Sequence, residues 1–108
     1  MFAKRKGYRV ERKIRIMLEN VGWKVVRAGA SLGQADLICI KNKKCILLQI
    51  KSTKKKKFYY YDYLNKTLEG FRFYVIVDFG YGKIRVLYPQ KIIAPTDGID
   101  FNDFLKNI

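Results

Sequence analysis

The sequence predicts a single α/β domain over residues 1–108, with a central mixed five-stranded sheet flanked by helices in the order helix, three strands, helix, two strands. Three observations support this fold class. An apolar stripe of helical period lies near the N-terminus, two nearly continuous apolar runs follow it, and two β-rich runs lie in the second half. With 108 residues, of which 49% are hydrophobic, the chain can fill one modest core.

The first predicted element is a helix over residues 7–21. Apolar residues spaced at i, i+4, i+7, i+8 and i+11 form one stripe, and Gly22 is a stop signal. The stripe consists of Val10, Ile14, Met17, Leu18 and Val21. Basic residues surround the rest of this segment, and we expect them to bind phosphate: Lys4, Arg5, Lys6, Arg9 and Arg12.

Three strands are predicted next, over residues 23–28, 35–40 and 45–50. The small-residue loop GASLGQ separates the first two strands. The second and third are nearly continuous apolar runs, which is typical of strands buried on both faces. Asn42 and Lys43 are expected to form a two-residue hairpin turn between them.

The pattern at the start of the second half fits more than one kind of element. Residues 58–71 are ambiguous, and a short helix over 60–69 ending at Gly70 is the favoured interpretation. Residues 72–79 and 83–89 are predicted strands joined by the turn GYG, and a last helix is predicted over 101–106.

The charge of the chain is distributed unevenly. The formal net charge is +14, and residues 1–61 contain 17 Lys or Arg but only three acids, whereas the remaining residues are balanced. Such a field attracts a polyanion, which favours nucleic acid as the partner. An acidic membrane surface is a weaker alternative, because no amphipathic anchor is evident.

No stretch has the length of a membrane span, and the N-terminus lacks the apolar region of a signal peptide. We therefore expect an intracellular protein without a membrane partner, in the cytoplasm or nucleoid, and both a cellular and a viral source fit the composition. Two cysteines and no histidine exclude a four-ligand zinc site and histidine-based nuclease chemistry. Cys39 and Cys45 are expected to be small apolar residues rather than a disulfide.

The predicted hairpin brings chemically active residues together. With Asn42 and Lys43 at the turn, Asp36 lies opposite Gln49, and Lys51 shares their face because it is two residues further along. An acid and a Gln-x-Lys unit at the end of an apolar hairpin suit a metal and a phosphate. Oxygen ligands of this kind favour Mg²⁺, with Mn²⁺ as a substitute, so Asp36 and Gln49 are predicted metal ligands.

These residues resemble the PD-(D/E)XK nuclease superfamily, and specifically the archaeal Holliday junction resolvases. The matching pieces are GYRVERKIRIMLENVGWKVVRAGAS, ADLICI and LLQIKSTKK, within residues 4–57. The resemblance implies a restriction-endonuclease-like fold and a homodimer that cuts branched, four-way DNA with Mg²⁺ by two symmetric nicks, without a small-molecule cofactor.

The resemblance also implies roles for individual residues. It makes Glu11 an essential acid and candidate metal ligand, Ser31 a loop residue of the active site, and Asp36 and Lys51 the motif aspartate and lysine. Arg12 and Arg27 match arginines of the family. Each of them either contacts phosphate or is a solvated surface residue. The family proline is replaced by Ala35, and the second motif carboxylate is replaced by the neutral Gln49.

Two stretches after the motif have open alternatives. The basic run of Lys54, Lys55, Lys56 and Lys57 is expected to contact backbone phosphates. The aromatic run from Phe58 to Tyr63 either stacks on unpaired bases or, as the favoured interpretation, belongs to the core or a dimer interface.

Two further functions remain open at this stage. One is another nuclease of the same superfamily that acts in repair or restriction, or on single strands or flaps, because a fold does not determine its substrate. The other is a catalytically impaired nuclease fold that only binds DNA, which the neutral Gln49 favours.

Overall fold

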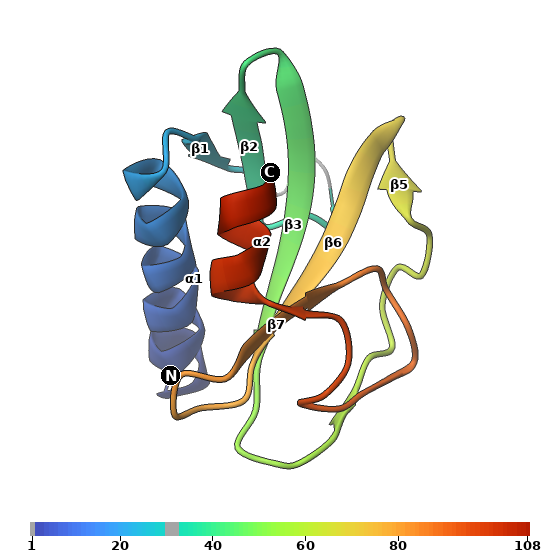
Figure 1. Cartoon of the computed structure of the whole chain (residues 1–108). Helices are drawn as coiled ribbons and strands as arrows, with labels where there is room; N and C mark the ends of the chain where they lie inside the picture. The colour runs from blue at the N-terminus through green and yellow to red at the C-terminus, as the bar shows by residue number, and fades with distance from the viewer. Residues whose placement is uncertain (1, 30–32) are drawn as a thin grey trace.

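The structure is a computed structural model that describes residues 2–29 and 33–108. Figure 1 shows a twisted sheet with one helix in front of its centre and the other beside it, at the left. In chain order the elements are α1 (Phe2–Asn20), β1 (Lys24–Arg27), β2 (Leu37–Lys41), β3 (Lys44–Ser52), β4 (Phe58–Tyr59), β5 (Thr67–Leu68), β6 (Phe71–Asp78), β7 (Ile84–Leu87), β8 (Ile92–Ile93), β9 (Ile99–Asp100) and α2 (Phe101–Asn107).

The five predicted strands form the centre of the main sheet, in the order β1-β2-β3-β6-β7. The pairs β1–β2, β2–β3 and β6–β7 are antiparallel, and β3–β6 is parallel, so the predicted mixed sheet is confirmed. Two short strands extend it: β9 pairs with β7, and β5 pairs with β6. β4 and β8 form a separate two-stranded ribbon.

Helix α1 packs on the sheet through the predicted stripe. Val10, Ile14 and Leu18 are buried in one core together with Leu37 and Leu48 of the sheet. The helix begins at Phe2, earlier than predicted, because residues 2–6 are mostly good helix formers outside the apolar stripe. It ends at Asn20, so Val21, predicted as the last stripe residue, lies outside the helix and is exposed.

The β2–β3 hairpin has the predicted register. Lys41 pairs with Lys44 and Ile40 with Cys45, across a turn in which Asn42 and Lys43 both have positive φ, at 50° and 66°. Such a turn matches the natural twist of paired strands. Leu47 and Leu48 are both buried, on opposite faces, which confirms a strand covered on two sides.

The two faces of the sheet are covered differently. Both helices lie over one face, where Phe101, Phe104 and Leu105 of α2 join the core of α1 (Figure 1). The opposite face has a second core, in which Tyr60, Leu68 and other residues pack on the sheet. Extended segments, rather than a helix, therefore cover this second face.

The helix predicted over residues 60–69 is wrong. The chain there is extended: the backbone N–H of Tyr60 donates to the carbonyl of Lys91, and Thr67 and Leu68 form β5. Gly70 ends no helix but belongs with Glu69 to the two-residue turn between β5 and β6, with φ of 53° at Glu69 and 82° at Gly70. The last predicted helix, by contrast, is confirmed as α2.

Two expectations from composition can be compared with the described residues. Cys39 is buried, Cys45 is partly buried, and both are free thiols, as expected of small apolar residues. Burial raises the pKa of the Cys39 thiol to about 12, with a smaller contribution from Cys45. No helix in the described part of the chain is long and apolar enough to cross a membrane.

The approach of β9 to β7 predicts a stability difference between two glycines. Gly98 and Gly80 both have positive φ, but a Cβ at Gly98 would overlap the carbonyl oxygen of Val86, whereas Gly80 faces open space. Gly80→Ala should cost roughly 1–2 kcal/mol for its left-handed backbone. Gly98→Ala should cost about 1–3 kcal/mol more through overpacking. Denaturant unfolding measures both, and equal costs would contradict the contact with Val86.

Candidate active site

Asp36 lies directly before β2, and hydrogen bonds fix its position. Its backbone N–H donates to the carbonyl of Leu48 at 2.8 Å, and its own carbonyl accepts from the N–H of Ala28 at 2.9 Å. The bond from Ala28 follows on from the β1–β2 pairing, whereas the bond to Leu48 lies just past the point where the β2–β3 pairing ends, at Leu37 and Leu48. Asp36 is thereby held beside the C-terminal half of β3, although the paired register ends at Leu37 and Leu48 and does not include the predicted pair of Asp36 with Gln49.

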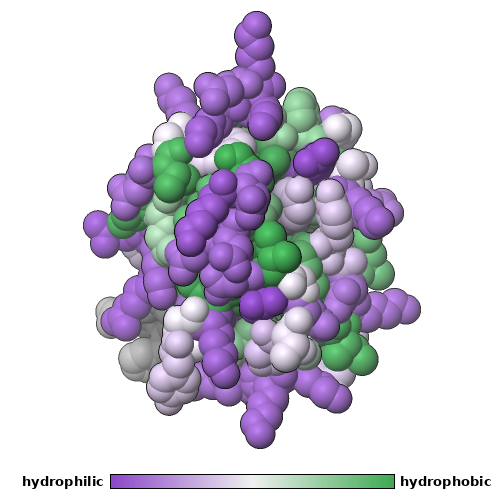
Figure 2. Space-filling model, viewed as in Figure 1, coloured by the Kyte–Doolittle hydropathy of each residue, from purple (hydrophilic) through white to green (hydrophobic). Residues whose placement is uncertain are grey.

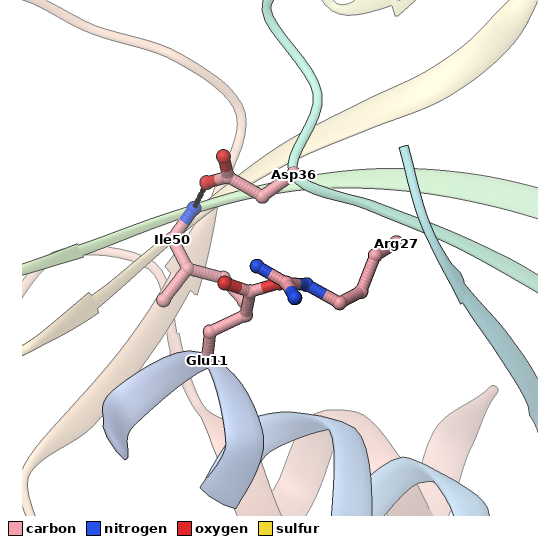
Figure 3. Close-up of polar contacts among 4 residues, drawn as sticks. All are labelled: Glu11, Arg27, Asp36 and Ile50. Atoms are coloured by element: carbon pink, nitrogen blue, oxygen red, sulfur yellow. Dashed lines mark hydrogen bonds and ion pairs between the residues drawn. The ribbon is translucent and has the colours of Figure 1, made fainter. Parts of the chain in front are cut away.

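The carboxylate of Asp36 accepts a hydrogen bond from the backbone of β3. The N–H of Ile50 donates to Oδ2 of Asp36 at 2.7 Å (Figure 3). This charge-assisted bond leaves Oδ1 without a hydrogen bond from the described residues. One oxygen of the carboxylate is thus used for orientation, and the other is available to a ligand.

Burial dominates the electrostatics of Asp36. It raises the pKa of the carboxyl above the ordinary value, and the hydrogen bond from Ile50 partly opposes the rise. The charge of Glu11 also raises this pKa, that of Lys51 lowers it, and that of Asp62 raises it. The charges of Glu11 and Asp62 therefore both repel that of Asp36, and a bound cation would relieve this repulsion.

Glu11 is on α1 and forms an ion pair with Arg27 of β1. Nε of Arg27 donates to Oε1 of Glu11 at 2.9 Å (Figure 3). The guanidinium also lies over the ring of Tyr8, 5.6 Å from its centre. The Glu11 side chain is 17% exposed and that of Arg27 is 55% exposed. Glu11 thus faces the site, whereas Arg27 extends from it toward solvent.

Gln49 is buried, with 6% of its surface exposed, and both ends of its amide are engaged. The hydroxyl of Tyr60 donates to Oε1 at 2.6 Å, and Nε2 donates to Oδ2 of Asp62 at 2.9 Å. Burial raises the pKa of Tyr60, so its hydroxyl remains a donor. Oε1 keeps one further lone pair, and its predicted role as a metal ligand stays a prediction.

Asp62 is the residue that the sequence reasoning missed. It follows the basic part of the chain and falls inside an aromatic run, where it matches no motif. The one available signal was an acid between tyrosines, which is an unusual neighbour for a core segment. A cavity of about 250 Å³ next to it is lined by Lys51, Phe58, Tyr59, Tyr60, Tyr61 and Asp62.

The structure divides the aromatic run between two environments. Tyr60 is 1% exposed and belongs to the second core, as the favoured interpretation expected. Tyr59 and Tyr61 are 52% and 89% exposed. A contact of these two rings with unpaired bases or with a second protein copy therefore stays a prediction.

The predicted phosphate-binding residues differ in how far they are exposed. Lys51 is partly buried on β3, whereas Arg9 and Arg12 are exposed on α1. Lys54, Lys55, Lys56 and Lys57 are all exposed after β3. Lys4, Arg5 and Lys6 belong to α1, and Ser31 lies outside the described residues. Figure 2 shows hydrophilic side chains over most of the face that carries the helices.

The donor atoms of the site suit a hard cation. Among residues 2–29 and 33–108, no three His, Cys, Asp or Glu side chains are close enough to hold a metal by themselves. Mg²⁺ does not need such a cage, because it usually takes one or two carboxylates and completes its shell with water and substrate phosphate. The Asp36 carboxylate and the Gln49 carbonyl oxygen therefore fit Mg²⁺ or Mn²⁺.

The fold and the family of the chain follow from comparison with known proteins. No curated protein sequence matches it. The structure of Hjc from Archaeoglobus fulgidus, a Holliday junction resolvase from an archaeal hyperthermophile, matches with a TM-score of 0.71 at 16% identity, over 95% of this chain and 98% of that chain. This likeness confirms the predicted fold. The family model of the archaeal Holliday junction resolvases (Hjc) matches residues 2–72, which is more than half of the chain and includes all the residues of the site described above, so the chain belongs to this family.

Proposed function

We propose that this protein is a Mg²⁺-dependent endonuclease that resolves four-way DNA junctions by paired, symmetric nicks. The observation that best supports this proposal is the Asp36 carboxylate, which Ile50 orients near Glu11 and Lys51 in a chain of the Hjc family. Mn²⁺ is the expected substitute for Mg²⁺. Branched DNA is the expected partner.

Each residue of the site has a separate role in this proposal. Asp36 and the carbonyl of Gln49 hold the cation, whose chemistry is to activate water and to neutralise charge on the scissile phosphate. The Lys51 ammonium stabilises the charge that develops on that phosphate. Glu11, with its partner Arg27, holds α1 against the site and adds negative charge near Asp36.

Paired nicks require two active sites. The described part of one chain carries one site centred on Asp36, so two copies of the chain are needed to cut two strands of a junction symmetrically. Most soluble homo-oligomers are two-fold dimers, and such a dimer matches two equivalent cuts. We therefore include a homodimer in the proposal, and sedimentation of the protein with and without junction DNA tests it.

One observation favours a second function, which is junction binding without cleavage. Both polar ends of Gln49 are engaged, and Glu11 is paired with Arg27, so few anionic oxygens remain for a cation. This function would be supported if the wild type and Gln49→Glu both bound junctions tightly and cut none with Mg²⁺ or Mn²⁺. A panel with linear duplex, flaps and single strands separates a resolvase from other nucleases of the superfamily.

The first prediction from this proposal concerns cleavage. The wild type should introduce paired nicks into a labelled four-way junction with Mg²⁺, and Asp36→Asn should cut more than about 100-fold more slowly, since a lost metal ligand removes several kcal/mol of transition-state stabilisation. Junction affinity without divalent cations should stay close to that of the wild type. Equal cleavage by wild type and Asp36→Asn would contradict the proposed role of Asp36.

The same substitution should have the opposite effect on stability. Because the pKa of Asp36 is raised in the folded state, its ionised form destabilises the fold at neutral pH. Asp36→Asn should therefore raise Tm at pH 7 without divalent cations, and the gain should vanish below the ordinary aspartate pKa of about 3.9. Asp103→Asn, at an exposed position of α2, is the charge-matched control. A lower Tm for Asp36→Asn at pH 7 would show that its charge stabilises the fold.

The third prediction concerns the exposed lysines after β3. Replacing Lys54, Lys55, Lys56 and Lys57 with Ala should reduce the slope of log affinity against log salt by about 2–4, because each phosphate contact contributes roughly 0.9. Lys83→Ala with Lys106→Ala, both exposed in the balanced half of the chain, is the control and should leave the slope nearly unchanged. A salt-independent affinity of the wild type would argue against phosphate contacts altogether.

A further inference from the structure

Asp62 lies between β4 and β5, with its carboxylate against the side chain of Gln49. Nε2 of Gln49 donates to Oδ2 of Asp62 at 2.9 Å, while Oδ1 of Asp62 accepts from the N–H of Tyr63 at 2.9 Å. The other end of the Gln49 amide accepts from Tyr60. Because Gln49 is almost fully buried, these bonds give its amide one defined orientation, with an anion behind the NH₂ group.

The site is short of negative charge without Asp62. Asp36 is available to a cation, but Glu11 is already paired with Arg27 at 2.9 Å, and Gln49 is uncharged. Lys51 adds a positive charge beside Asp36. A dication held by oxygen ligands usually has one or two carboxylates around it. One further anion close to Asp36 would therefore strengthen cation binding.

Two observations connect Asp62 to the same space. Consecutive residues of β3 bind the two carboxylates, because Nε2 of Gln49 donates to Asp62 and the N–H of Ile50 donates to Asp36. Asp62 also lines one cavity together with Lys51, the predicted phosphate-stabilising residue. The carboxylate is therefore on the Asp36 and Lys51 side of the molecule, although it comes from a different segment of the chain.

We propose that Asp62 is a positioning residue of the cation site, which acts through Gln49 and supplies the negative charge that Gln49 lacks. The hydrogen bond from Nε2 to Asp62 fixes the amide and makes its carbonyl oxygen a better donor to a dication. The inference rests on the proposed cation-dependent function, but it concerns binding of the cation rather than cleavage.

The experiment measures Mn²⁺ binding to the free protein by the loss of the free-ion electron paramagnetic resonance signal. Asp62→Asn retains an acceptor for the Gln49 amide but removes the charge, so a purely structural role predicts unchanged Mn²⁺ affinity. Our inference predicts an affinity about 10–100-fold weaker, as for other residues that support a metal ligand. Asp103→Asn removes one charge at a remote exposed position and should bind Mn²⁺ like the wild type.

The exchange variant Gln49→Glu with Asp62→Asn provides the rescue. It moves the carboxylate to position 49, keeps the net charge, and places an amide at position 62 that can donate to this carboxylate, so Mn²⁺ affinity should return close to that of the wild type. The inference is overturned if Asp62→Asn binds Mn²⁺ normally, if the exchange variant binds no better than Asp62→Asn, or if the wild type does not bind Mn²⁺. Melting temperatures of each variant identify any loss of folded protein.

Cleavage is measured separately on the same samples. A wild type that binds Mn²⁺ in an Asp62-dependent way but cuts no junction would contradict the proposed function and leave the role of Asp62 intact. A wild type that cuts junctions while Asp62→Asn keeps full Mn²⁺ affinity would contradict the role of Asp62 and leave the proposed function intact.

Discussion

The two-residue turn at Asn42 and Lys43 determines the register of the β2–β3 hairpin, and this register determines what surrounds Asp36. A shift by one residue would move every side chain of a strand to the opposite face. Asp36 would then lose the N–H of Ile50, and Gln49 would face the helices instead of Tyr60. The buried residues on both faces of β3 oppose such a shift, because each face has its own apolar core.

A second constraint follows from Gln49, which is the one buried polar residue among residues 8–29 and 33–108. An amide inside an apolar core must form hydrogen bonds, since an unsatisfied buried group costs roughly 1–3 kcal/mol. Tyr60 and Asp62 satisfy it, and they can do so because the chain after β4 runs extended across the second face. The site and the irregular covering of the sheet are thus parts of one arrangement.

Which parts of the fold and site could be predicted from the sequence depends on how far apart in the chain the interacting residues are. The stripe through Ile14 and the hairpin at Asn42 are encoded in neighbouring residues, so the helix and the hairpin register from Leu37 to Leu48 were predictable. The contact of Gln49 with Asp62 spans 13 residues and depends on the path between them, which no local pattern reveals. The same long-range contacts override helical propensity in residues 60–69, and Gly70 was misread because turns and helix ends both favour glycine.

The strongly basic first part of the chain imposes a requirement on its few acids. Lysine and arginine attract DNA, but a hydrolytic site also needs ionised carboxylates next to the phosphates that this field brings in. Burial alone would favour a protonated Asp36, and the Ile50 N–H and Lys51 counteract it by lowering its pKa. The charges of Glu11 and Asp62 raise the pKa of Asp36 and so oppose the effect of Lys51 and the Ile50 N–H. Asp36 is therefore held in an anionic environment whose repulsion a divalent cation would relieve, which connects the electrostatics of the folded chain to the chemistry proposed for it.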